Sequence, residues 1–205
     1  MSNTDTKEQR ILNAATKQFA LNGYGSTRMD KIADEAQVNK ATIYYKIGDK
    51  SALYEKVYTV MLDALIEELS TACKDSENPK VALQHYVDTF ARHCEKNVFM
   101  SRIVLREVAS QGQHLSKSPL MKMQQVRNIL SDIIHKGIEN KVFNPTNPYL
   151  IHMLIIGFLN FYSAGKPIRD KVSDLDDNQK HYNILSTAEA GQEISQLILN
   201  SISTD

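Results

Sequence analysis

Hydroxyl, phenol, guanidinium and ammonium groups gather in residues 27–50, and most of them stand close to a predicted helix start. Thr27 and Arg28 precede one short apolar stripe, Asn39 precedes a second, and Lys50 opens a third helix. The first turn of a helix carries backbone N–H groups without intrahelical acceptors, and these groups bind anions well when a cation stands beside them. Three such helix starts in one short segment predict a surface that binds phosphate groups.

The segment after Asn39 adds groups that could reach the edges of nucleic-acid bases. Several of its side chains can form hydrogen bonds, and Ala41 is small enough to let the start of the helix approach a binding partner closely. The complete set of residues predicted to contact DNA is Thr27, Arg28, Asn39, Lys40, Ala41, Thr42, Tyr44, Tyr45, Lys46 and Lys50.

These residues need a scaffold of three short helices. Apolar residues at helical spacing predict one helix from near Thr6, a second from Thr27 and a third after residues 37–39. Ala33 stands where the second and third helices would cross, and Ile43 would close a small core beneath them. This spacing is typical of a helix-turn-helix, whose second helix enters the major groove. The spacing alone is also compatible with a small three-helix subdomain that does not bind DNA and whose lysines are exposed to solvent.

The same residues resemble, in register, the N-terminal domain of the TetR (tetracycline-repressor-like) family of transcriptional regulators. The resemblance covers roughly residues 6–55. The matching residues are Ile11, Leu12, Asn13, Ala14, Ala15, Phe19, Ala20, Gly23, Tyr24, Thr27, Ile32, Ala33 and the ranges 36–45 and 50–53. The sequence departs from the family pattern at Lys46 and Ile47, where a polar ring and a phenylalanine are more usual, although Ile47 can still pack as an anchor.

The resemblance implies an all-α homodimer. A three-helix helix-turn-helix domain, predicted as residues 1–50, would precede a six- to seven-helix effector-binding and dimerisation bundle, predicted as residues 51–205. The implied function is a DNA-binding regulator, most often a repressor, that binds a palindromic operator and is released by a small-molecule effector. By position, the resemblance assigns phosphate contacts to Thr27, Tyr45 and Lys50, a capping role to Asn39, and contacts with bases or nearby backbone to Lys40, Ala41, Thr42 and Tyr44.

Helical periodicity continues after Lys50, and no segment reads convincingly as a strand. A long amphipathic helix is predicted from Lys50, followed by a linker over 74–79. Further helices are predicted near 80–95, 97–110, 118–139, 148–164 and 182–202, with a polar loop over 166–180. The helix near 148–164 is apolar nearly all round, so we expect it to form the dimer interface together with the helix near 182–202.

Apolar and aromatic side chains on the middle helices would either pack as core or line a pocket for an effector. The residues predicted to line such a pocket are Tyr86, Phe90, His93, Met100, Ile103, Met123, Val126, Leu154 and Phe158. Because few charges interrupt these faces, the predicted effector is an apolar or amphipathic small molecule.

The sequence contains no motif of a known catalytic or metal site, such as G-x-S-x-G, a P-loop or H-E-x-x-H. We therefore predict no enzymatic activity, no cofactor and no metal. The alternative that stays open is a helical small-molecule-binding protein or enzyme without specific DNA binding.

Charge and hydropathy narrow the classes of partner. The chain has 24 basic and 24 acidic residues, which argues against a nonspecific DNA-coating protein because nonspecific affinity comes from phosphate neutralisation. Residues 1–50 hold eight Lys or Arg and six Asp or Glu, a net charge of +2, against −2 for the remainder.

The longest apolar stretch, 153–161, is too short to span a bilayer, and no signal pattern opens the sequence. These features predict a cytoplasmic protein with no membrane partner.

Overall fold

The computed structural model describes residues 6–74, 76–175 and 184–204. Within these ranges the chain forms ten helices and no strand, which confirms the predicted all-α fold. The helices are α1 (Lys7–Ser26), α2 (Met29–Ala36), α3 (Lys40–Lys46), α4 (Lys50–Cys73), α5 (Pro79–Lys96), α6 (Val98–Ala109), α7 (Lys117–Glu139), α8 (Pro148–Ala164), α9 (Lys166–Ser173) and α10 (Thr187–Ile202).

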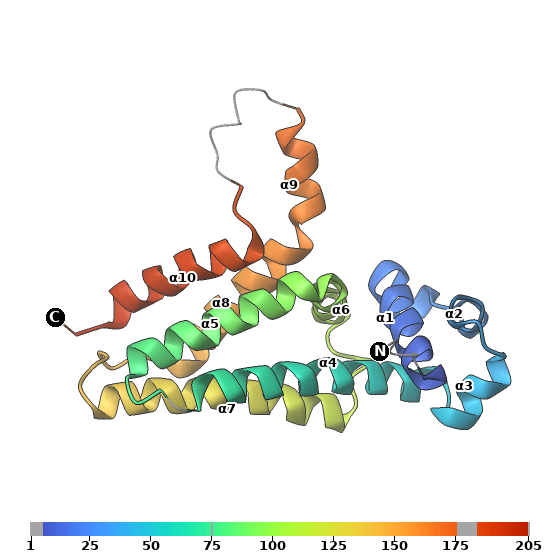
Figure 1. Cartoon of the computed structure of the whole chain (residues 1–205), viewed down its shortest axis with the longest axis horizontal. Coiled ribbons are helices and arrows are strands. Elements are labelled where there is room, and N and C mark those ends of the chain that lie inside the picture. Colours follow the sequence, from blue (N-terminus) through green and yellow to red (C-terminus); the bar gives the residue numbers. More distant parts are fainter. Residues whose placement is uncertain (1–5, 75, 176–183, 205) are drawn as a thin grey trace, which may run out of the picture.

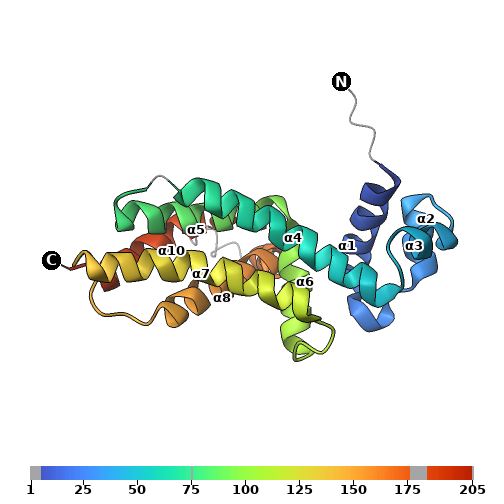
Figure 2. The ribbon, with the colours of Figure 1, turned by 90° about the horizontal axis from the view of Figure 1, so that it is seen from below.

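The first three helices form a small unit at one end of the molecule, and α4 leads from it into the bundle (Figure 1). Figure 2 shows α4 and α7 side by side along the bundle, with α4 extending beyond it to the three-helix unit. The buried side of α4 includes Leu53, Val57, Tyr58, Leu65 and Leu69, at the spacing of one helix face. Because α4 is continuous over this length, it is packed into both parts of the molecule.

Short polar side chains fix where several helices begin. Thr6, Asn39, Asp49, Asn78 and Asn147 each accept a hydrogen bond from a backbone N–H in the first turn of the following helix. Such caps satisfy donors that the helix itself leaves unpaired. This explains why the sequence located these starts to within a residue or two.

Two predictions about the C-terminal segment were wrong. The predicted loop over 166–180 contains α9, a helix with no buried residues that projects away from the bundle (Figure 1). Charged residues dominate α9, and its only apolar pair at helical spacing is Ile168 and Val172, both of which are exposed. The predicted start of the last helix near 182 is also wrong: residues 182–183 lie outside the described ranges, and α10 begins at Thr187. A reciprocal capping box between Ser186 and Glu189 sets this start.

The core of the bundle is a layer of large apolar side chains on α4, α5, α7 and α8, with α10 packed across α5. The α5–α10 contact is close because Gly191 faces Ala91, and a Cβ atom at position 191 would overlap the Ala91 methyl group. In the described residues no single helix is long and apolar enough to cross a bilayer; α8 and α9 pass that test only as a pair, bent by 54°.

The close approach at Gly191 predicts that Gly191→Ala destabilises the protein by about 1–3 kcal/mol, because overpacking outweighs the gain in helix propensity. Gly25→Ala is the matched control, since nothing lies within 4 Å of the Cβ position there. Urea denaturation of both variants checks this. Equal midpoints for the two variants would contradict the α5–α10 packing.

Candidate nucleic-acid interface

Helices α2 and α3 and the turn between them form the predicted helix-turn-helix. α2 ends at Ala36, Gln37 adopts a left-handed conformation (φ 53°), and the Asn39 side chain accepts from the backbone N–H of Ala41 at 2.9 Å. Ala33 on α2 is buried, and Ile43 on α3 is completely buried. The predicted connection over residues 37–39 and the predicted cap are confirmed.

The outer side of α3 offers hydrogen-bonding groups to solvent. Tyr45 is 91% exposed and Tyr44 is 48% exposed, while Thr42 is half-buried. Exposed side chains that share this surface or flank it belong to Arg28, Asn39, Lys40, Ala41 and Lys46. Ile47 is half-buried and packs against the core, as expected for an anchor. The geometry therefore leaves a protruding helix whose polar side is free and whose apolar side holds it in place.

Lys40 is tied to the neighbouring helix by an ion pair, with its Nζ 2.9 Å from a carboxylate oxygen of Asp30. The hydrogen bond from Lys40 to Asp30 raises the pKa of this lysine. The pair is exposed, so it contributes little to stability. The ion pair links the start of α3 to the first turn of α2.

The sequence predicted that Thr27 begins α2, and this prediction was wrong. The N-cap position of α2 is Arg28, and Thr27 terminates α1. The Thr27 side chain is buried, and its hydroxyl lies 2.6 Å from the Gly23 carbonyl oxygen and 3.1 Å from that of Gln18. Among the predicted DNA contacts, Thr27 is thus the residue whose hydroxyl is already used within the protein.

Lys50 stands at the start of α4, as predicted, but its side chain also turns back onto the end of α1. Its Nζ donates to the Gly25 carbonyl at 3.2 Å and lies 4.7 Å from the centre of the Tyr24 ring. Partial burial lowers the pKa of the Lys50 ammonium. This lysine therefore connects α1 and α4 in addition to offering a cation beside α3.

The residues predicted to line an effector pocket differ in their surroundings. Tyr86, Phe90, Ile103 and Val126 are buried in the bundle core, and Met123 and Phe158 are partly buried and pack against it. Leu154 is 56% exposed on α8. Only His93 and Met100 of the nine line the pocket of about 400 Å³ that lies between α1, α4, α5 and α6.

Contacts between the three-helix unit and the bundle were not predicted from the sequence. The Arg106 guanidinium on α6 donates to the carbonyls of Ala20 and Leu21 on α1, at 3.0 and 2.7 Å. α1 kinks beside this contact at Gly23, where φ is +75° and an added Cβ would approach Arg106 to 3.2 Å. No local pattern marks such a contact, because its partners are more than eighty residues apart.

The fold and this surface define the chain as a helix-turn-helix DNA-binding regulatory protein. Residues 11–57 match the family model for bacterial regulatory proteins of the tetR family, and residues 79–183 match the model for the tetracyclin repressor-like C-terminal domain. The chain belongs to the TetR family of transcriptional regulators. The matched family consists of regulatory proteins rather than enzymes.

Named relatives agree with this assignment. The uncharacterized HTH-type transcriptional regulator YhgD of Bacillus subtilis is 29% identical over 73% of this chain and 78% of its own. The HTH-type transcriptional repressor NicS of Pseudomonas putida is 27% identical over 79% of this chain and 78% of its own. Among solved structures, the regulator PfmR of Thermus thermophilus has a TM-score of 0.75 at 22% identity, covering 98% of this chain and 99% of its own.

The position of Lys50 predicts that Lys50→Ala weakens DNA binding about equally on every sequence and lowers the salt slope by about one unit per subunit, since it removes a phosphate contact. Fluorescence anisotropy titrations at several salt concentrations measure this. Lys74→Ala, at the far end of α4, is the control and should leave the slope unchanged. A thermal melt of Lys50→Ala separates the loss of its α1 contact from the loss of DNA contact.

Thr42 lies in the middle of α3, so Thr42→Ala should change which bases are tolerated, at a cost of about 1–3 kcal/mol for the affected base pair. The salt slope should stay nearly constant, because no phosphate contact is lost. Titration against a panel of single-base operator variants checks this. The assignment is wrong if Thr42→Ala changes only the salt dependence while Lys50→Ala changes base preference.

Proposed function

We propose that this protein is a ligand-responsive repressor that works in the cytoplasm, binds a palindromic operator as a homodimer and is released by a small-molecule effector. The observation that carries the proposal is the protruding α3, with exposed Tyr44 and Tyr45 on one side and fully buried Ile43 on the other. A single recognition helix reads only a few base pairs, so two copies related by a twofold axis would supply the specificity an operator needs.

An unpartnered apolar face on α8 supports the homodimer. The α8 face, which we define as Leu150, Met153, Leu154 and Phe161, is between 43% and 73% exposed. These residues recur at helical spacing, and nothing lies within 4 Å of the Cβ position of Gly157 among them, so a second helix could approach closely. Leu197 on α10 is 63% exposed. Two helices from each subunit would then form a four-helix contact.

The relatives support the repressor and effector parts of the proposal. NicS is named a transcriptional repressor. The regulator FadR of Bacillus subtilis, whose solved structure is in complex with stearoyl-CoA, has a TM-score of 0.68 at 18% identity, covering 92% of this chain and 97% of its own. In our proposal DNA and effector favour different spacings of the two recognition helices, so that each ligand weakens the binding of the other.

Binding-site selection from random duplex DNA with the purified protein tests the proposal. We expect an inverted repeat whose half-sites are centred about one helical turn apart, roughly 34–36 Å, or slightly more. Recovery of no enriched sequence, with equal competition by random DNA, would instead favour a helical small-molecule-binding protein without specific DNA binding.

The α8 face predicts that Leu154→Glu gives a monomer, because a buried unpaired carboxylate at a twofold contact is costly in each subunit. Affinity for a two-half-site operator should fall by at least ten-fold as dimers dissociate. Leu120→Glu is the matched control, since Leu120 is 51% exposed on α7. Sedimentation equilibrium measures the mass; a dimeric Leu154→Glu variant would place the interface elsewhere.

A further inference from the structure

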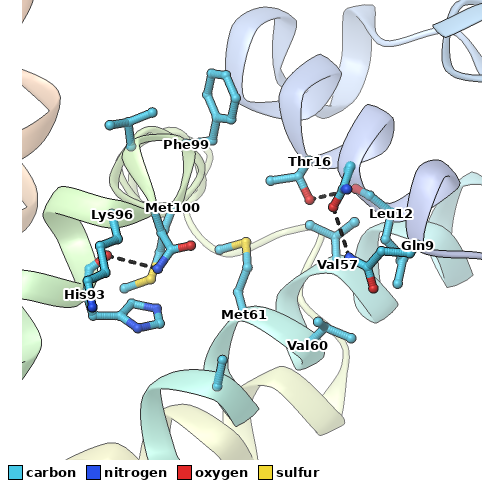
Figure 3. A pocket seen from close by; sticks show the side chains of 14 residues that line it. Gln9, Leu12, Thr16, Val57, Val60, Met61, His93, Lys96, Phe99 and Met100 are labelled. Carbon is cyan, nitrogen blue, oxygen red and sulfur yellow. Dashed lines mark hydrogen bonds between the residues drawn. The ribbon is translucent and has the colours of Figure 1, made fainter. Parts of the chain in front are cut away.

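The interdomain pocket lies between the three-helix unit and the bundle, with walls from α1, α4 and the α5–α6 junction. Its volume of about 400 Å³ falls in the lower part of the range for small-molecule sites, about 300–1,000 Å³. Figure 3 shows Met61 projecting from α4 into the space between α1 and α6, with Thr16 on one side and Met100 on the other. The pocket shares only His93 and Met100 with the set of residues that the sequence predicted to line an effector site.

The lining combines an apolar floor with a cationic rim. Leu12, Val57, Met61 and Met100 supply apolar surface, and methionine side chains adapt to ligands of different shape. Lys96 lies at the edge and is exposed. No aspartate or glutamate lines this pocket, and in the part of the chain that the structure describes no carboxylate lies within 4.0 Å of the Lys96 ammonium.

Hydrogen bonds made by His93 and Asn97 hold the wall near Lys96. His93 is buried, and its Nδ1 lies 2.9 Å from a carboxylate oxygen of Glu68. The Asn97 side chain donates to the His93 carbonyl at 3.0 Å, which closes the end of α5 (Figure 3). The apolar floor and the one lysine are thus presented by ordered elements rather than by a loose segment.

We infer that the interdomain pocket binds a small amphipathic anion, with an apolar body against Met61 and Met100 and its anionic group at Lys96. We infer further that this pocket is the site through which the protein senses its effector, a part of the inference that rests on the proposed function.

An occupant here would act directly on the DNA-binding unit. The Arg106 contact fixes α1 to α6 near the kink at Gly23, whereas the pocket separates the same two helices along Leu12–Thr16. A molecule bound in the pocket contacts one half of α1 while Arg106 holds the other half, so it favours the arrangement of α1 on α6 in which the pocket is open. Phe99 also lines an adjoining cavity that reaches Glu35 and Gln37 at the end of α2, which places the pocket wall next to the helix-turn-helix.

The first test compares decanoate with decanol, which share an apolar chain and differ in charge. Isothermal titration of the full-length protein should show that decanoate binds more tightly than decanol. Lys96→Gln should weaken decanoate binding about five-fold, the effect of one exposed charge pair, and change decanol binding less than two-fold. Lys80→Gln, at the opposite end of the same helix, is the matched control and should bind both probes as the wild type does.

The second test locates the bound probe. Because the chain has no tryptophan, Phe99→Trp introduces a single tryptophan into the pocket wall, and excitation at a wavelength that tyrosine does not absorb separates its emission from that of the nine tyrosines. Decanoate should shift the emission of Phe99→Trp to shorter wavelength by removing water, whereas Tyr149→Trp, placed on α8, should not respond. Decanoate should also release the wild-type protein from its selected operator, and Lys96→Gln should need about five-fold more of it.

The inference is overturned if decanoate does not bind, or if it binds without shifting Phe99→Trp emission and without dependence on Lys96. If the protein binds a specific operator but gives either of these results with decanoate, the proposed function stands and the pocket is not its effector site. Tight decanoate binding at Phe99 by a protein that selects no DNA sequence would do the reverse: the pocket would stand as a binding site and the proposed regulatory function would fail.

Discussion

A buried carboxylate lies at the junction of the two parts, next to the contacts that hold the DNA-binding unit on the bundle. Glu107 on α6 is 3% exposed, and such a charge is tolerated only when its oxygens are satisfied. Its Oε2 accepts from the Tyr54 hydroxyl at 2.7 Å and lies 3.2 Å from His114 Nδ1, while its Oε1 accepts from the His114 backbone N–H at 2.9 Å. Burial, together with the charge of Glu107, raises the pKa of the Tyr54 phenol, so this group stays a donor.

The α1–α6 contacts gather around this carboxylate. The Tyr54 and His114 rings both lie against Tyr24 at the end of α1. Arg106, the residue before Glu107 on α6, donates to the Ala20 and Leu21 carbonyls. Aromatic contacts and charge-assisted hydrogen bonds of this kind are directional, so α1 has one favoured orientation on α6. The open pocket at the other half of α1 leaves that half with fewer constraints. The junction is therefore rigid at one end and adjustable at the other, which is what a regulated coupling between two domains requires.

Local chemistry decided what the sequence could predict. The cap at Asn39 and the burial of Ile43 follow from residues close in the chain, and both were predicted. Thr27 was misplaced because its hydroxyl bonds depend on a kink in α1. The exposure of Leu154 could not be predicted because, in a helix that is apolar nearly all round, packing and not pattern decides which face lies outward. The Tyr54–Glu107 hydrogen bond and the interdomain pocket have no local signature, because the residues that form them come from helices far apart in sequence.

The central claim is that ligand and DNA favour different arrangements of the two DNA-binding units in a dimer. The distance between these units tests this claim most directly. A spin label at Lys31→Cys, on the exposed side of α2, in a Cys73→Ser background, reports this distance by pulsed electron paramagnetic resonance. The account predicts one narrow distance distribution with operator and a different, shifted distribution with decanoate. Identical distributions in both samples, with each ligand bound, would contradict it.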